Sequence, residues 1–202
     1  MKTQIVLIHG GETFDTYEDY ISHLKSIELD LERADGEKKK WKNTLGEKLG
    51  DAFEIIQPQM PCAWNAKYAE WKIWFEKYLP YLNDGMILIG HSLGGIFLAK
   101  YLSENKLTQK IKATIMIAAP FDDTESEYSL GDFVLGEDLS LLEEQGGRCI
   151  FYHSTDDMIV SLANFENYKT KLPEADFRLH DDKGHFNQEE FSELVEVLEE
   201  LT

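Results

Sequence analysis

The sequence predicts an α/β fold in which a mostly parallel sheet of about six strands carries helices on both faces. Short runs rich in Val, Ile and Leu recur along the chain. Most of them are continuous rather than alternating, as expected of strands that are buried on both faces. Helical segments lie between the runs, which is typical of strand–helix–strand crossovers in a parallel sheet. The predicted strands are Gln4–Ile8, Phe53–Gln57, Met86–Ile89, Ala113–Ala118, Cys149–His153 and Asp176–Leu179.

The helical layers are predicted from apolar residues spaced by three or four positions. Such residues run from Trp64 to Leu82 and predict one face of a long helix. A similar stripe from Phe191 to Leu201 predicts the last helix, with Glu on most of its other face. Between the first two strands, the charged stretch Arg33–Lys42 predicts an exposed break between two helical segments.

The length and charge of the chain limit the classes of protein it can belong to. With 202 residues it fits a single domain, 1–202. Its formal net charge of −18 repels phosphates and anionic headgroups, so we expect neither nucleic acid nor membrane as a partner. No apolar run approaches the about 18 residues that a membrane-spanning helix needs. Oligomeric state is left open.

The beginning of the chain and its cysteines indicate a cytoplasmic protein. Met1 leads into a strand within a few residues, which leaves no room for a secretory signal. The two cysteines, Cys62 and Cys149, have neither a C-x-x-C pair nor metal-ligand spacing. We therefore expect a reducing compartment and no metal ion.

One long connection departs from a minimal strand–helix pattern. The segment Phe121–Gly147 holds nine acidic residues, no basic residue and several large apolar ones. Connections of this length in compact domains are often lids or binding loops. We expect residues 121–147 to form a short lid on a domain that otherwise has a minimal cap or none.

The most specific motif joins the third predicted strand to a helix. Met86–Ile89 runs into Gly-His-Ser-Leu-Gly at positions 90–94, and a helical segment follows. A serine on a sharp strand-to-helix turn is strained and exposes its hydroxyl, provided that small residues stand two positions before and after it. Gly90 and Gly94 meet that need around Ser92. The turn also places Ser92 at a helix N-terminus, which stabilises developing negative charge. Ser92 is the predicted nucleophile.

A serine hydroxyl needs a base, and the base needs an acid that orients it. In a parallel sheet these groups come from loops at the carboxyl ends of other strands. Among six histidines, only His185 lies in a glycine-containing loop between the last strand and the last helix. The loop after the preceding strand offers Asp156 and Asp157, and the pair Asp122 and Asp123 is a further source of the acid.

These motifs resemble those of α/β-hydrolase-fold serine hydrolases. The elbow at 90–95, the segment H-S-T-D-D-M-I-V and the segment G-H-F occur in the order Ser, Asp, His expected of that fold. The small size and the details S-T-D-D and G-H-F further resemble compact, cap-poor hydrolases of the retinoblastoma-binding-protein type and their bacterial relatives. The likeness spans nearly the whole chain.

The resemblance implies roles for particular residues. In hydrolases of this type the acid stands three residues before a valine, which here is Val160, so Asp157 is preferred over Asp156. One oxyanion donor is the backbone N–H of Leu93. The second is expected from the loop after the first strand, with Gly11 preferred and Glu12 next; H-G-G-E replaces a run of three glycines here.

The predicted function is a cytoplasmic serine hydrolase that cleaves a carboxylic ester or related acyl bond of a small molecule, without metal or organic cofactor. Two alternatives stay open: thioester or amide chemistry on the same triad, and a non-catalytic ligand- or protein-binding module on this scaffold. Candidate residues for a substrate pocket are the aromatic side chains of Trp64, Phe121 and Phe133.

Overall fold

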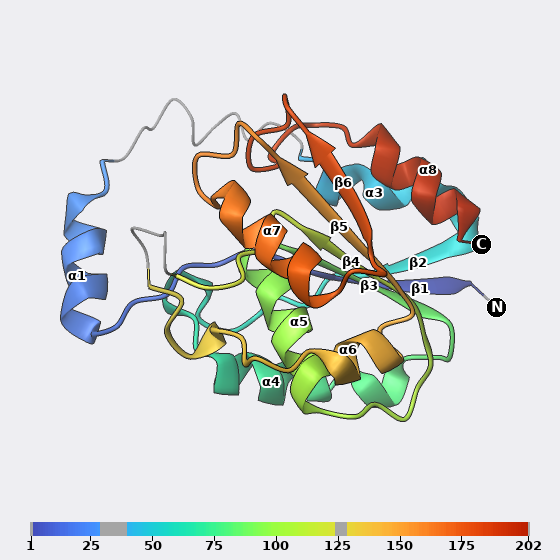
Figure 1. Cartoon of the computed structure of the whole chain (residues 1–202), viewed down its shortest axis with the longest axis horizontal. Coiled ribbons are helices and arrows are strands. Elements are labelled where there is room, and N and C mark those ends of the chain that lie inside the picture. Colours follow the sequence, from blue (N-terminus) through green and yellow to red (C-terminus); the bar gives the residue numbers. More distant parts are fainter. Residues whose placement is uncertain (1, 29–39, 124–128, 202) are drawn as a thin grey trace.

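A computed structural model describes residues 2–28, 40–123 and 129–201, and its six strands form one sheet (Figure 1). Every neighbouring pair is parallel, and the strand order is β2-β1-β3-β4-β5-β6. The α/β prediction with about six strands is therefore confirmed. The strands are β1 Thr3–Ile8, β2 Phe53–Ile56, β3 Met86–His91, β4 Ile111–Ile117, β5 Arg148–Ser154 and β6 Asp176–His180.

Helices cover both faces of the sheet because the strands bury apolar side chains on both sides. In β1, Ile5 and Leu7 pack with α3 and α8, whereas Val6 and Ile8 belong to the core beneath α4, α5, α6 and α7. No helix in the described part of the chain has both the length and the hydrophobicity for a membrane crossing. The helices are α1 Tyr17–Ser26, α3 Trp41–Leu49, α4 Tyr68–Glu76, α5 Leu93–Glu104, α6 Ser140–Gln145, α7 Leu162–Lys171 and α8 Ser192–Glu200.

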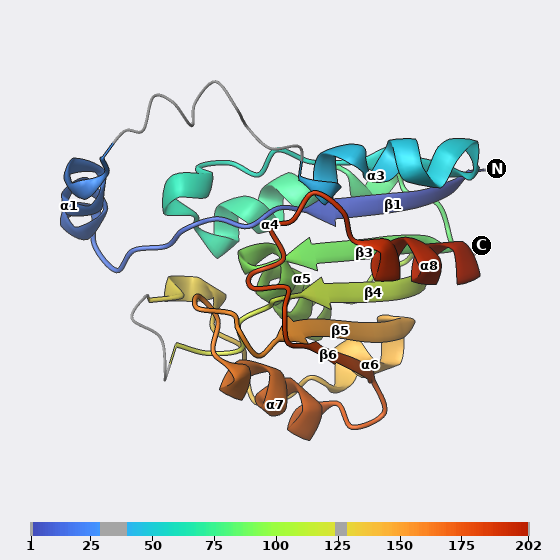
Figure 2. The same cartoon turned by 90° about the horizontal axis from the view of Figure 1, so that it is seen from above.

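The carboxyl ends of all six strands meet at one edge, and α1 projects beyond that edge (Figure 2). A capping box stabilises α1 locally: the hydroxyl of Thr16 accepts from the N–H of Asp19, whose carboxylate accepts from the N–H of Thr16. None of the residues of α1 is buried. This helix therefore belongs to the outer wall of the carboxyl edge rather than to the core.

The long helix predicted from Trp64 to Leu82 is broken in the structure. Only α4 is α-helical, and short 3₁₀ turns at Ala63–Asn65 and Leu79–Tyr81 flank it. The carboxylate of Asp132 accepts from the N–H of Tyr68 at 2.9 Å and thereby fixes the first turn of α4. Beyond its end, Pro80 has no N–H to continue an α-helix.

The two predicted irregular segments are only partly described. Positions 33–39 lie outside the described residues, but Trp41 and Lys42 begin α3, and Trp41 is only 2% exposed. The exposed break therefore ends earlier than predicted.

Of residues 121–147, 124–128 lie outside the described residues. In the later part, Phe133 and Leu142 are fully buried in the core that contains α5, so this part packs as core.

Candidate active site

Ser92 lies on a sharp turn between β3 and α5, as predicted. Its backbone has φ 55° and ψ −124°, a conformation that residues with a side chain rarely adopt. The N–H of Ser92 donates to the carbonyl of Ile117 on β4 at 2.8 Å and helps to hold this conformation. The turn therefore presents the serine at the carboxyl edge of the sheet, at the first turn of α5.

The two glycines around Ser92 are required by contacts between backbone segments. A Cβ atom on Gly90 would lie 2.3 Å from the carbonyl oxygen of Gly94. A Cβ atom on Gly94 would lie 2.4 Å from the carbonyl oxygen of Ile8 in β1. Because rigid backbone stands in both places, only glycine fits, and α5 can start directly behind Ser92.

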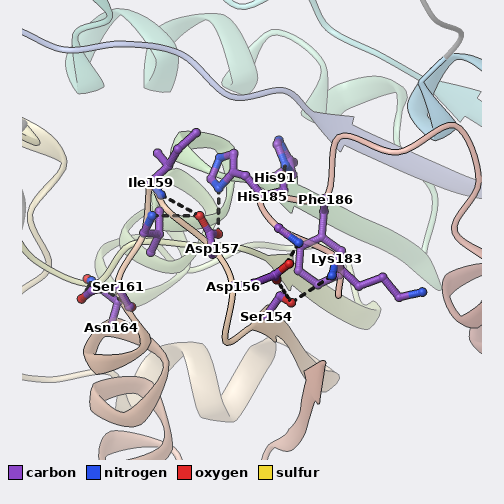
Figure 3. A network of polar contacts seen from close by, with 12 residues as sticks. His91, Ser154, Asp156, Asp157, Ile159, Ser161, Asn164, Lys183, His185 and Phe186 are labelled. Atoms are coloured by element: carbon purple, nitrogen blue, oxygen red, sulfur yellow. Dashed lines mark hydrogen bonds and ion pairs between the residues drawn. The ribbon is translucent and has the colours of Figure 1, made fainter. Parts of the chain in front are cut away.

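The loops after β5 and β6 bring Asp157 and His185 together (Figure 3). Nδ1 of His185 lies 2.9 Å from one carboxylate oxygen of Asp157. The other oxygen accepts from the N–H groups of Ile159 at 2.8 Å and Val160 at 3.1 Å. The side chain of Asp157 is fully buried and that of His185 is 10% exposed. This arrangement orients the imidazole through a carboxylate that is itself held by the backbone.

The protonation of Asp157 follows from these contacts. Burial by itself would raise its pKa, but hydrogen bonding and charge attraction from His185, together with the two backbone N–H donors, leave the pKa below its ordinary value. Asp157 is therefore ionised at neutral pH and can stabilise a positively charged imidazole.

Asp156 makes different contacts from Asp157. Its carboxylate accepts from the hydroxyl of Ser154 at 2.5 Å and from the N–H of Gly184 at 2.8 Å. The Ser154 hydroxyl in turn accepts from the N–H of Lys183 at 3.0 Å (Figure 3). Asp156 thus anchors the loop that carries His185 without contacting the imidazole.

The other pair of candidate acids also lies elsewhere. The carboxylate of Asp122 accepts from the side-chain amide of Asn167 at 3.2 Å, and that of Asp123 from the N–H of Leu130 at 3.3 Å. Among the described residues, only Asp157 places a carboxylate oxygen within hydrogen-bond distance of His185.

His185 contacts the elbow at His91, the residue before Ser92. The ring centroids of His91 and His185 are 5.0 Å apart, and Nε2 of His91 is 2.8 Å from the carbonyl oxygen of His185. Within the described residues no hydrogen bond joins the hydroxyl of Ser92 to His185. Without substrate, catalytic hydrogen bonds of this kind are often long and shorten in the complex.

The loop after β1 supplies a wall beside the nucleophile. A Cβ atom on Gly11 would lie 3.2 Å from Cδ2 of Leu93, so the two predicted oxyanion donors come from adjacent segments. Glu12, the other candidate, donates its N–H to the carbonyl of Ala63 at 2.8 Å and so is already engaged. Nε2 of His9 accepts from the N–H of Met60 at 2.9 Å, which helps to shape this loop.

A pocket of about 240 Å³ opens at Ser92. Among the described residues around it, two carry carboxylates, Glu12 and Asp122, and none is Lys or Arg. Glu12 pairs with His23 of α1 at 3.0 Å, so α1 contributes to the pocket rim. The pocket is lined by Gly11, Glu12, Thr13, Phe14, His23, Ser92, Leu93, Pro120, Asp122, Ser129, Leu130, Ile159, Val160, Ser161 and Asn164.

None of the three aromatic residues predicted to line a substrate pocket does so. Trp64 is 58% exposed on the 3₁₀ turn before α4. Phe121 stacks edge-on against Tyr168 of α7, and Phe133 is fully buried against Trp71 of α4. Phe121 and Phe133 thus gain more from packing against other aromatic rings than from lining an open pocket, whereas Trp64 lies on the surface. We therefore correct this prediction.

Sequence reasoning also missed a residue that shapes the pocket. Asn164, in the first turn of α7, is buried and lines the pocket. Its side-chain oxygen accepts from the N–H groups of Phe121 at 2.7 Å and Asp122 at 3.1 Å. It thereby fixes the loop after β4. No motif marks it; the only available signal was a polar residue in an otherwise apolar register of a helix.

A parallel sheet in this order, with a strained serine after β3 and a histidine in the loop after β6, defines the α/β-hydrolase class of protein. Solved structures agree with this class. The ydeN gene product of B. subtilis is similar with a TM-score of 0.72 and 18% identity, covering 99% of this chain and 98% of that chain. Naproxen esterase (carboxylesterase NP) of Bacillus subtilis is similar with a TM-score of 0.64 and 12% identity, covering 100% and 84%.

Sequence comparison narrows the class to a family. The pattern of the family described as serine hydrolase matches residues 34–202. The serine hydrolase RBBP9 of Rattus norvegicus is 26% identical over 151 residues, which are 74% of this chain and 78% of that protein. The chain belongs to the serine hydrolase family, and the compact α/β-hydrolase resemblance seen in its motifs is confirmed.

Proposed function

We propose that this hydrolase cleaves carboxylic esters of small molecules through Ser92, His185 and Asp157. The observation that carries the proposal is the 2.9 Å contact between His185 and a buried, ionised Asp157, beside a serine held at positive φ. Such a pair can take up a proton from a serine hydroxyl and stabilise the charge that results. Sequence order and the shared edge of the sheet support the same assignment.

The first half of the reaction makes an acyl-enzyme. Oγ of Ser92 attacks the ester carbonyl carbon while Nε2 of His185 takes the hydroxyl proton. The carbonyl π electrons move to the oxygen, and the N–H groups of Leu93 and Gly11 stabilise that oxyanion. Each such donor is worth about 3 kcal/mol in the transition state. When the oxyanion collapses, the C–O bond to the leaving group breaks, and His185 gives its proton to the departing alcohol.

The second half returns the free enzyme. Water attacks the acyl carbon while His185 accepts one of its protons, and collapse of the second oxyanion breaks the bond to Ser92 Oγ. The proton held by His185 then restores the serine hydroxyl. Asp157 stays ionised throughout and stabilises the imidazolium in both halves.

The pocket supports a preference for short, uncharged or cationic esters. Its volume of about 240 Å³ lies slightly below the roughly 300–1,000 Å³ usual for ligand sites, which favours short acyl groups. Glu12 and Asp122 add negative charge at its wall, so an anionic ester would meet repulsion.

Both cysteines are free thiols, which supports the proposal that the enzyme acts in the reducing cytoplasm.

Covalent labelling tests the proposal directly. A fluorophosphonate probe should label the wild-type protein, and Ser92→Ala should abolish labelling and lower ester turnover by about a millionfold. The matched control is Ser103→Ala on α5, whose hydroxyl donates to the carbonyl of Ala99 in the same helix, and it should leave labelling unchanged. Equal labelling of Ser92→Ala and wild type would contradict the assignment of the nucleophile.

A further inference from the structure

The loop that carries His185 is held by hydrogen bonds to three of its carbonyl groups. The carbonyl of His185 accepts from Nε2 of His91 at 2.8 Å. The carbonyl of Phe186 accepts from the indole N–H of Trp41 at 2.9 Å, and that of Gln188 from the backbone N–H of Trp41 at 3.1 Å. That backbone N–H stands at the start of α3, where N–H groups lack partners within the helix. β3 and the first turn of α3 therefore anchor this loop.

The loop needs such anchors because its backbone is strained next to the base. Phe186 has φ 52° and its side chain is fully buried. A bulky residue at positive φ costs about 1–3 kcal/mol and persists only where the surroundings hold it. A loop that loses an anchor can relax this strain, and His185 would then move with its neighbour.

Lys42, in the first turn of α3, helps to determine which nitrogen of His91 carries the proton. Nζ of Lys42 lies 2.8 Å from Nδ1 of His91. An ammonium group can only donate, so Nδ1 must accept and the proton of the neutral ring must sit on Nε2. From Nε2 that proton is donated to the carbonyl of His185. The donor-only ammonium of Lys42 at one end of this chain of contacts and the acceptor-only carbonyl of His185 at the other therefore select the same tautomer of His91.

The charges around the pair keep these roles fixed. Burial, and then the positive charge of Lys42, lower the pKa of His91 well below its ordinary value, so the ring stays neutral. Burial, and then the nearby charge of Lys40, lower the pKa of Lys42 to about 8, so the ammonium form predominates at pH 7. A charged lysine facing a neutral imidazole is a stable donor–acceptor pair.

We propose that Lys42 is a positioning residue for the base: it sets the tautomer of His91 and, through it, the backbone position of His185. This inference rests on the proposed function, because it concerns the residue proposed to move the proton. Without Lys42, only the carbonyl of His185 still favours the proton on Nε2. A ring that carries its proton on Nδ1 then places two acceptors, Nε2 and that carbonyl, opposite each other. The loop would shift, and the imidazole with it.

The experiment compares substitutions in α3. Lys42→Met should lower kcat for a short p-nitrophenyl ester about tenfold with little change in KM, because sub-ångström misplacement of a catalytic group slows chemistry rather than binding. Lys42→Arg keeps a side chain that can only donate and should recover most of the rate. The control Lys48→Met removes a charge from the same helix, where the lysine pairs with Glu190 at the surface, and should keep the wild-type rate.

Imidazole ¹⁵N resonances read the tautomer itself. Wild-type His91 should be neutral with its proton on Nε2, and Lys42→Met should move population to Nδ1 at an unchanged thermal midpoint. A wild-type ring protonated on Nδ1, or a Lys42→Met protein with unchanged kcat and unchanged tautomer, would overturn the proposal. The readouts also separate the two hypotheses. A wild-type protein without ester turnover would refute the proposed function, while the resonances of His91 and His185 would still decide what Lys42 does.

Discussion

The candidate active site has two halves that are held in different ways: an acid–base half, Asp157 and His185, and a substrate half, the residues that line the pocket. In the acid–base half, Asp157 is fully buried and its carboxylate accepts from two backbone N–H groups. The substrate half combines buried lining residues such as Asn164 with an outer wall at the surface. In that wall Ile159 is 53% exposed, its neighbour Met158 is 94% exposed, and α1 at the rim has no buried residue. Chemistry thus depends on the core, whereas recognition also depends on outer-wall groups that few contacts fix.

This difference has a physical consequence for how the site tolerates change. Groups fixed by the core share the free energy of unfolding of the whole domain, whereas surface segments open at a much lower cost. Substitutions in the acid–base half should therefore change rate or stability by several kcal/mol. Substitutions in the exposed outer wall of the substrate half should change selectivity by modest factors and leave the fold intact.

The largest effect is expected at the buried acid. Asp157→Asn should lower kcat about ten-thousandfold, because an amide can stabilise the wrong imidazole tautomer and cannot stabilise its positive charge. Asp156→Asn is the matched control and should cost about tenfold or less, since Asp156 anchors the loop and does not contact the ring. Steady-state kinetics with a short ester measures both. Equal losses in the two variants would contradict the assignment of the acid.

A substitution at a glycine of the elbow should lower the stability of the protein rather than change its substrate selectivity. Gly94→Ala would place a Cβ atom 2.4 Å from the carbonyl oxygen of Ile8, which must shift the backbone of β1 or α5. We expect a loss of about 3 kcal/mol in the free energy of unfolding, measured by urea denaturation. Gly136→Ala, where no described atom beyond the chain neighbours lies within 4 Å of the new Cβ, should be within about 1 kcal/mol of wild type. A stable Gly94→Ala protein would show that the turn relaxes freely.

Features set by a local stretch of sequence could be predicted, whereas features set by the packing of separate segments could not. The six strands were predictable because most of them are continuous apolar runs, although β6 alternates polar and apolar residues. The elbow was predictable because steric need leaves a local signature of two glycines around Ser92. Asp157 and His185 followed from loop order and resemblance. The pocket lining did not follow, because it combines side chains from separate segments such as His23 and Asn164, whose meeting depends on the packed structure.

Two predictions differ from the structure because distant residues decide the outcome. Apolar periodicity from Trp64 to Leu82 predicted one helix, since the pattern does not reveal that Asp132 caps the chain at Tyr68. Lys42 was assigned to an exposed break because a charged side chain gives no sign that a buried imidazole accepts its proton. Both features depend on partners about 50 or more residues away in the sequence.

A smaller effect is expected from charge in the pocket wall. Asp122→Asn should raise the ratio of kcat/KM for an anionic ester to that for a neutral ester of the same length by about fivefold, since a partly screened charge pair is worth up to about 1 kcal/mol. The neighbouring variant Asp123→Asn serves as control, because Asp123 binds the N–H of Leu130 and does not line the pocket. Identical ratios in the two variants would remove Asp122 from substrate recognition.

The smallest effects should separate two equally exposed apolar residues. Trp64 is 58% exposed and is not among the described residues that line the pocket, whereas Ile159 is 53% exposed and lines it. Because both side chains are largely in solvent, neither alanine variant should alter folding much, so their kinetics can be compared directly. Across a series of acyl chain lengths, Ile159→Ala should change the preference between adjacent lengths by about threefold, the loss of part of one apolar contact. Trp64→Ala should follow the wild-type profile within experimental error. A reversed result would mean that acyl groups run over the outer surface before α4 instead of along the wall beside Ser92, and the pocket would then hold the leaving group.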